Sequence, residues 1–173
     1  LLLGAFIVSC IFTVDPNEVA VVLRFGKPVG TGPDQLLRQG LHLAFPSPID
    51  EIVRIRSGEA KTVVATNAWY ATNAEMEATK QGPDANPSLN PGADGYSLTS
   101  DGNILHMRAT MTYRVTDPVA YAFEYTDVEG LLGNALNNAI YQTSARFTAD
   151  AAVYRDVEAF RGAVKSQMAQ LIE

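Results

Sequence analysis

The sequence has little positive charge and only one cysteine. Lys and Arg together number 13 in 173 residues, against 19 Asp and Glu, and the formal net charge is −6. A nucleic-acid-binding protein needs a cationic face to contact phosphates, so this composition argues against one. One cysteine excludes a disulfide scaffold and a multi-cysteine metal site. A hydrophobic content of 47% excludes a wholly disordered chain, and the length suits one domain or a domain with appendages.

Charged side chains are missing from the first twelve residues, LLLGAFIVSCIF. As a helix this stretch would span about 18 Å, whereas crossing a bilayer takes about 20 apolar residues. We interpret residues 1–12 as the C-terminal part of a transmembrane helix that begins before Leu1. A cleaved signal peptide and a buried core strand are the alternatives. The expected membrane-anchor residues are Leu1, Leu2, Leu3, Phe6, Ile7, Val8, Ile11 and Phe12.

The residues after this segment indicate its orientation. Asp15 and Glu18 come first, and the first basic residue is Arg24. Positive charge tends to stay on the cytoplasmic side, so this flank is typical of a translocated one. No cluster of Lys or Arg forms a polybasic lipid-binding patch. We therefore expect membrane attachment to be apolar.

Short β-branched or alternating segments predict strands at residues 18–25, 40–45, 49–56 and 104–115. The last is the clearest, because its odd positions from Leu105 to Val115 are apolar or aromatic and its even positions are polar. A period of two over twelve residues predicts one continuous strand with one buried face and one exposed face.

Helix signals fill most of the remainder. Asp117-Pro118 is typical of an N-cap followed by a proline in the first turn, and 126–129 fits a capping box. Asp150 is expected to cap a third helix, the start of a long one over 150–173. Its apolar stripe is Tyr154, Val157, Phe160, Val164, Met168 and Leu171. This stripe packs on the domain's own sheet or, in the last turns, on a neighbouring subunit. The interface candidates are Met168, Leu171 and Ile172.

Residues 66–97 are rich in Asn, Ala, Gly and Pro and have a net charge of −3. A loop of this length is uncommon inside a compact domain. We interpret it as an insertion that is either an excursion with its own contacts, anchored by Trp69 and Tyr70, or a mobile flap.

No arrangement of residues points to catalysis or to a metal. His42 and His106 lie on separate predicted strands without a zinc-binding spacing, and Cys10 lies in the apolar segment. Ser100-Asp101-Gly102-Asn103 lacks the acidic residue that a calcium loop requires and is better explained as a turn. We therefore expect no catalytic, metal-binding or cofactor-binding residues and no enzymatic activity.

Several segments together resemble the SPFH (Band 7, prohibitin-like) superfamily, and within it the bacterial HflK type. They are 13–27 (TVDPNEVAVVLRFGK), 40–42 (GLH), 45–50 (FPSPID), 98–104 (LTSDGNI) and 113–118 (YRVTDP) followed by Tyr121. Two features depart from the family pattern. Gln39 stands where the family usually has a proline before Gly40, and the 66–97 segment is longer than the expected link.

The resemblance implies an α+β domain over 13–173, with a small antiparallel sheet packed by helices and leading into a long helix. It also implies a single-pass protein of the bacterial inner membrane with its SPFH domain in the periplasm. HflK-like and HflC-like subunits would be partners in large ring- or cage-like oligomers. These assemblies would enclose an FtsH-type AAA protease and limit the access of its substrates.

The sequence also fits two other functions. One is a stomatin- or flotillin-like organiser of membrane microdomains that acts on lipids or channels without a protease. The other is a membrane-bound hydrolase with a site built by residues 66–97. Co-purification of a protease separates the first of these from the scaffold, and a turnover assay addresses the second.

Overall fold

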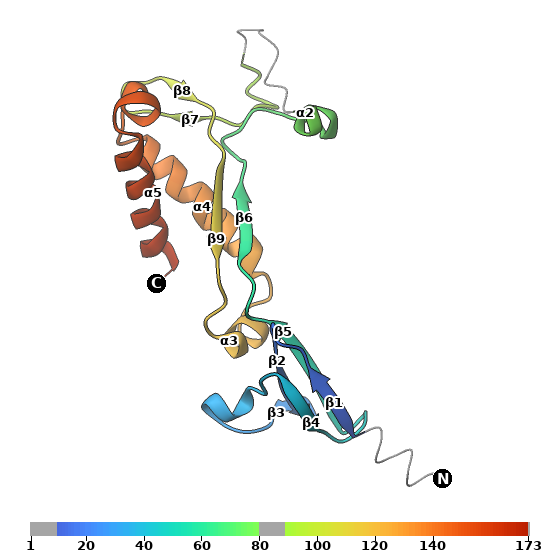
Figure 1. The fold of residues 1–173 in the computed structure, drawn as a ribbon. Coiled ribbons are helices and arrows are strands. Elements are labelled where there is room, and N and C mark those ends of the chain that lie inside the picture. Colours follow the sequence, from blue (N-terminus) through green and yellow to red (C-terminus); the bar gives the residue numbers. More distant parts are fainter. Residues whose placement is uncertain (1–9, 80–88, 173) are drawn as a thin grey trace. The chain divides into compact units, whose positions relative to one another are not determined.

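The computed structural model describes residues 10–79 and 89–172, and the chain divides into two compact units. Unit 1 comprises residues 1–61 and 112–128, and unit 2 comprises residues 62–111 and 129–173. Figure 1 labels the main elements. In chain order they are β1 (Ile11–Val14), β2 (Glu18–Arg24), β3 (Lys27–Pro28), the 3₁₀ turn η1 (Gly32–Gln35), β4 (Gly40–Leu43), β5 (Asp50–Arg56), β6 (Lys61–Ala65), α2 (Ala74–Thr79), β7 (Ser97–Leu98), β8 (Ile104–Leu105), β9 (Ala109–Tyr113), α3 (Pro118–Phe123), α4 (Val128–Ser144), the π-helical turn η2 (Ala151–Arg155) and α5 (Val157–Ile172).

Unit 1 contains two small antiparallel sheets. One has the strand order β3-β2-β5, with β2 and β5 paired along their whole length from Glu18–Arg56 to Arg24–Asp50. The other consists of β1 and β4 alone. The three expected strands of this region are therefore present, although β2 ends one residue and β4 two residues earlier than predicted.

The core of unit 1 lies on the central strand β2. Val21, Leu23 and Ile55 form a buried cluster, against which α3 packs through Val119 and its neighbours. The opposite side of β2 is buried as well, because Ala20 and Val22 are 0% and 8% exposed. A strand that is covered on both faces reads as a continuous apolar run, which explains the sequence VAVVL.

Helix α3 begins as the sequence predicts. The carboxylate of Asp117 accepts hydrogen bonds from the backbone N–H groups of Val119 and Ala120, each at 3.0 Å. Pro118 occupies the first helical position, where its missing N–H costs nothing. The helix also contributes Tyr121, whose hydroxyl accepts a 2.7 Å hydrogen bond from Lys61 Nζ.

Unit 2 is built on α4, which supplies more buried apolar side chains than any other element among its described residues. Leu132, Leu136, Ala139 and Ile140 are buried on it, and Val63 and Ala65 are buried on β6. Asn137 is also buried, with its Oδ1 accepting from the N–H of Asn67 at 3.1 Å and its Nδ2 donating to the carbonyl of Gly133 at 2.9 Å. Both ends of this buried amide are thereby satisfied.

The expected single strand over 104–115 is instead two strands, β8 and β9, separated by residues 106–108. β8 pairs with β7 and β9 pairs with β6. Between the two strands, His106 Nδ1 lies within hydrogen-bond distance of the carbonyl of Gly95, and the N–H of Met107 donates to the carbonyl of Ala68. Residues 106–108 therefore belong neither to the β7–β8 pair nor to the β6–β9 pair. The alternation itself holds from Leu105 to Val115, with odd positions half-buried and even positions exposed.

The turn between β7 and β8 agrees with the sequence interpretation. Gly102 has φ +76°, a conformation that favours glycine, and the hydroxyl of Thr99 donates to Asp101 Oδ1 at 2.5 Å. The same carboxylate accepts a hydrogen bond from the N–H of Ala149 at 3.1 Å. Asp101 therefore joins this hairpin to the segment before α5.

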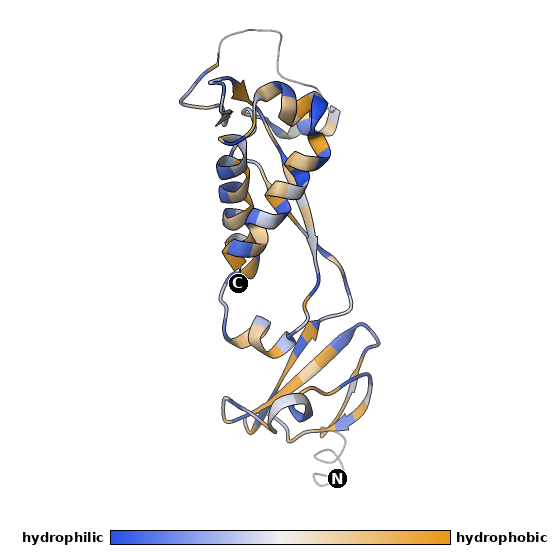
Figure 2. Ribbon diagram, turned by 90° about the vertical axis from the view of Figure 1, so that its left-hand side faces the viewer, coloured by the Kyte–Doolittle hydropathy of each residue, from blue (hydrophilic) through white to orange (hydrophobic). Residues whose placement is uncertain are grey.

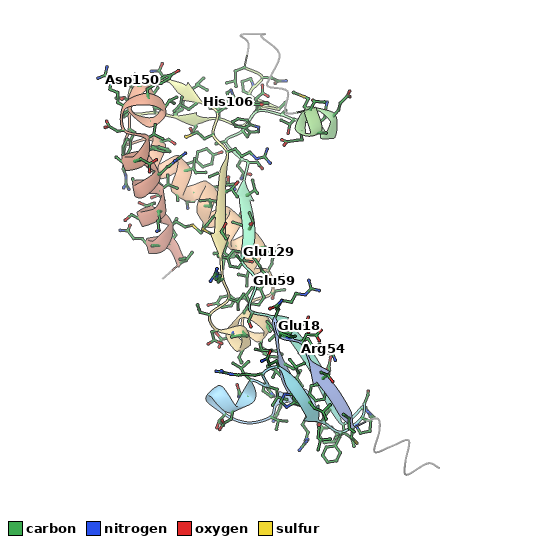
Figure 3. The ribbon with its side chains drawn as sticks, in the orientation of Figure 1. Glu18, Arg54, Glu59, His106, Glu129 and Asp150 are labelled. Carbon is green, nitrogen blue, oxygen red and sulfur yellow. The ribbon has the colours of Figure 1, made fainter. Side chains whose placement is uncertain are left out.

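The expected helix cap at Asp150 is not formed. Asp150, labelled in Figure 3, already has helical dihedral angles and makes no side-chain capping bond. Its carboxylate pairs with Arg155 instead. The N–H of Ala151 instead donates to Thr148 Oγ1 at 3.3 Å. A π-helical turn follows, and α5 begins only at Val157. The carboxylate that was expected to cap the helix is thus taken up by an arginine five residues further along the chain.

The N-terminal region also differs from the prediction. Ile11 and Phe12, expected at the end of a transmembrane helix, lie in strand β1, which pairs with β4. Leu1, Leu2, Leu3, Phe6, Ile7 and Val8 lie outside the described residues. Within the described ranges, the helices are all too short or too polar to span a bilayer. The described elements together make an α+β protein with small antiparallel sheets and C-terminal helices.

Candidate membrane-facing and subunit-facing surfaces

One face of the β1–β4 sheet presents apolar side chains to solvent. The register places Ile11 opposite Leu43 and Thr13 opposite Leu41, so these four side chains share a face. Ile11, Leu41 and Leu43 are 43%, 70% and 75% exposed. Phe45 continues the alternation of β4 and is exposed as well. We call Ile11, Leu41, Leu43 and Phe45 the apolar face.

The other side of this small sheet is covered. Val14 is 2% exposed, and the rings of Phe12 and His42 contact each other with centroids 5.7 Å apart. His42 Nε2 lies 2.7 Å from the carbonyl oxygen of Arg38, so this histidine is held at the strand start. Apolar side chains are therefore exposed on one side of this sheet only, and the first of them, Ile11, belongs to the uncharged segment 1–12.

An ion pair fixes the chain directly after the apolar face. Arg24 Nε and a terminal nitrogen donate to the two carboxylate oxygens of Asp50 at 2.8 and 3.0 Å. The N–H of Phe45 donates to the same carboxylate at 2.9 Å, and the Arg24 guanidinium lies 4.9 Å from the centre of the Phe45 ring. The Arg24 hydrogen bonds hold the pKa of Asp50 below its usual range, and the Phe45 N–H adds to this effect.

A second exposed aromatic lies at the turn between β2 and β3. Phe25 has φ +49° and is 76% exposed. A bulky residue in the left-handed region of backbone conformation is uncommon, and no neighbouring residue in the described part of the chain buries the Phe25 ring. The sequence places Phe25 in a buried strand, and neither composition nor periodicity distinguishes it from Leu23.

The subunit-facing candidates lie on the last two turns of α5. Met168 is 4% exposed, whereas Leu171 and Ile172 are 39% and 53% exposed. The stripe also contains Phe160, which packs edge-on against Phe147 at 5.4 Å. Figure 2 shows hydrophilic and hydrophobic bands alternating along this helix. The stripe is thus buried within the chain at Phe160 and Met168, and its end is exposed.

His106 and Asp101, whose side chains are of the kinds that catalysis uses, have structural partners. His106, labelled in Figure 3, has its Nδ1 2.7 Å from the carbonyl oxygen of Gly95, and its ring contacts Tyr70 edge-on. Asp101 organises the β7–β8 turn, as described above. Across residues 10–79 and 89–172, no three His, Cys, Asp or Glu side chains gather as metal ligands would.

Sequence reasoning missed the apolar face, and the reason is physical. The strand at 40–45 is visible, but which of its faces is covered depends on its pairing with β1. The sequence predicts a helix at residues 11–12, and a helix there would exclude this pairing. The one available signal is the alternation of Leu41, Leu43 and Phe45 in a segment with no charged residue.

Comparison with known proteins decides the family. The SPFH domain / Band 7 family matches residues 12–173, nearly all of the chain. The chain belongs to this family. Its members are membrane-associated and are generally non-catalytic scaffolds. The resemblance expected from the sequence is therefore confirmed.

Curated relatives carry the HflK name at low identity. The chain is 26% identical over 142 residues to the modulator of FtsH protease HflK of Escherichia coli K12, covering 82% of this chain and 26% of that protein. It is 21% identical over 173 residues to protein HflK of Borreliella burgdorferi, covering 100% of this chain and 50% of that protein. The chain thus spans between about a quarter and a half of the length of these relatives.

Proposed function

We propose that this chain is a membrane-anchored scaffold subunit of a large HflK/HflC-like oligomer. The oligomer encloses an FtsH-type AAA protease and limits the access of substrates to it. The observation that carries the proposal is the family match over residues 12–173. The printed name of the Escherichia coli relative, a modulator of FtsH protease, supports the choice of protease.

The apolar face supports membrane attachment on the N-terminal side. Leu41 and Leu43 are 70% and 75% exposed. Burying a leucine side chain contributes about 1.5–3 kcal/mol relative to leaving it in water. Lipid contact through this face would add to anchoring by the segment that contains Leu1–Leu3 and Phe6–Val8. It would also fix the orientation of unit 1 toward the bilayer.

The open end of α5 supports lateral assembly. Leu171 and Ile172 offer apolar surface at the end of a stripe in which Phe160 and Met168 are buried, whereas its first member, Tyr154, is exposed. Individual contacts of this size are weak. When many subunits are held in one plane by a bilayer, effective concentration turns weak contacts into a closed wall. The mechanism is steric and requires no catalytic residue.

Purification in mild detergent tests the proposal. The full-length protein, expressed with its natural neighbours, should elute as a large complex that contains HflC-like subunits and an FtsH-type hexamer. Recovery of a large complex without a protease would support the microdomain organiser instead. A monomeric protein in detergent and in nanodiscs would contradict both.

A further inference from the structure

An open groove in unit 2 lies outside the two surfaces described above. Its volume is about 480 Å³, within the range of small-ligand sites. Two stretches of the 66–97 segment form it, one around Trp69 and Tyr70 and the other around Asp94. The oligomer proposal uses none of these residues.

The groove walls are tied together by one main-chain hydrogen bond and one hydrogen bond from the main chain to a carboxylate. The N–H of Gly95 donates to the carbonyl of Trp69 at 2.9 Å, and the N–H of Ala71 donates to Asp94 Oδ1 at 2.9 Å. Gly95 lies so close to the opposite wall that a Cβ there would be 2.1 Å from the carbonyl oxygen of Asn67. The site is therefore held in place before any ligand arrives, which lowers the entropy lost on binding.

Charge in the groove has one sign. Asp94 is the sole charged residue among the described residues that line it. Hydrogen bonds from the N–H groups of Ala71 and Asn90 hold the pKa of this carboxyl below its usual range, so it is ionised at neutral pH. These two donors occupy part of the acceptor capacity of the carboxylate, which offers about four lone-pair positions. An anionic ligand is disfavoured and a cation is favoured.

The aromatic wall also favours a cation. Trp69 and Tyr70 are half-buried, and their rings pack on each other with centroids 4.4 Å apart and an interplanar angle of 35°, so a cation would contact the sides that this packing leaves uncovered. The face of such a ring attracts ammonium and guanidinium groups. This chain uses the same contact twice elsewhere, with Arg24 over Phe45 and Lys61 over Tyr121.

We propose that this groove binds a lysine or arginine side chain presented by a peptide segment of a partner protein. The cationic head would lie between the aromatic wall and Asp94. The remaining length of the groove would take the adjoining main chain, for which the lining residues Thr66, Asn67 and Thr72 offer polar groups. This inference is independent of the oligomer and of the protease.

Trp69 is the one tryptophan of the chain, so its fluorescence reports on the groove directly. The intact chain in a non-ionic detergent is titrated with acetyl-Gly-Arg-Gly-amide. The matched probe carries citrulline, which has nearly the shape of arginine but no charge. We expect a saturable change with the arginine peptide and binding at least roughly tenfold weaker with the citrulline peptide. Equal response to both peptides, or no saturable response, would overturn the proposal.

Variants locate the binding. Tyr70→Leu and Asp94→Asn should each weaken binding of the arginine peptide severalfold. Tyr154→Leu, at a side chain that is 80% exposed and outside the groove, should not. Asp94→Asn replaces a carboxylate oxygen that accepts a hydrogen bond from a backbone N–H, so far-ultraviolet circular dichroism is used to check that this variant is folded. If it is unfolded, the result with Tyr70→Leu decides whether the groove is the binding site. Agmatine binding as tightly as the peptide would overturn the peptide assignment.

Discussion

Arg24 and Asp50 face each other at the ends of β2 and β5 and form a two-pronged ion pair. The carboxylate side chain is fully covered, while the arginine side chain is 44% exposed. The pair also receives the N–H of Phe45, the last member of the apolar face. It therefore links the main sheet of unit 1 to the strand that carries that face.

Replacing Asp50 by Asn should lower the melting temperature and weaken the dependence of stability on acid. The folded-state pKa of Asp50 lies below its unfolded value of 3.8, so its stabilisation is complete above that pH. It is lost as the pH falls through the folded-state pKa. Thermal melts of both proteins between pH 2 and pH 7 measure this difference.

Glu51→Gln is the matched control for this prediction. Glu51 is the next residue on β5, and its side chain is exposed. The variant should melt like the unmodified protein across the same pH range. If the two variants showed the same acid dependence, the ion pair would not be the source of the effect.

Gly95→Ala should destabilise unit 2, whereas Gly92→Ala should be tolerated. A Cβ at Gly95 would lie 2.1 Å from the carbonyl oxygen of Asn67 and 2.7 Å from that of Trp69. Both obstacles are backbone, so relieving them shifts main chain and costs roughly 1–3 kcal/mol. At Gly92 the nearest atom is 3.5 Å away, an ordinary contact. Urea denaturation of both variants compares their free energies of unfolding.

Met111→Asp and Thr112→Asp test the alternation on β9. Met111 is half-buried and Thr112 is exposed. The carboxylate of Met111→Asp would face the apolar side of the strand and lower the free energy of unfolding by on the order of 1–3 kcal/mol. The carboxylate of Thr112→Asp would stay in water and change the stability little. Equal free energies of unfolding for the two variants would show that the strand has another register.

The parts of the fold that sequence predicted correctly depend on local chemistry. The Asp117-Pro118 helix start and the Gly102 turn each need only a few adjacent residues. Alternation from Leu105 to Val115 was also correct, because period two follows from strand geometry alone. The break in that strand could not be predicted, because it depends on the hydrogen bonds that residues 106–108 make with residues distant in the sequence.

The candidate surfaces were harder to predict for the same reason. The exposed ends of α5 and β4 depend on which neighbours cover each side chain. The stripe that ends at Leu171 is visible as a period, but burial of Met168 and exposure of Ile172 are decided by tertiary packing. Likewise, no spacing in 66–97 indicates that Trp69 and Asp94 line one groove.

The apolar face should contact lipid when the protein is reconstituted into vesicles. A bimane label at Leu43→Cys, in a Cys10→Ser background, should be quenched by brominated lipid chains. The same label at Val64→Cys provides the control, because Val64 is 41% exposed but lies on β6 in unit 2. Leu43→Asp should leave the melting temperature in detergent nearly unchanged, since this side chain is 75% exposed. Equal quenching at residues 43 and 64 would show that lipid does not distinguish the apolar face, and orientation of unit 1 by the bilayer would then have to come from the preceding segment alone.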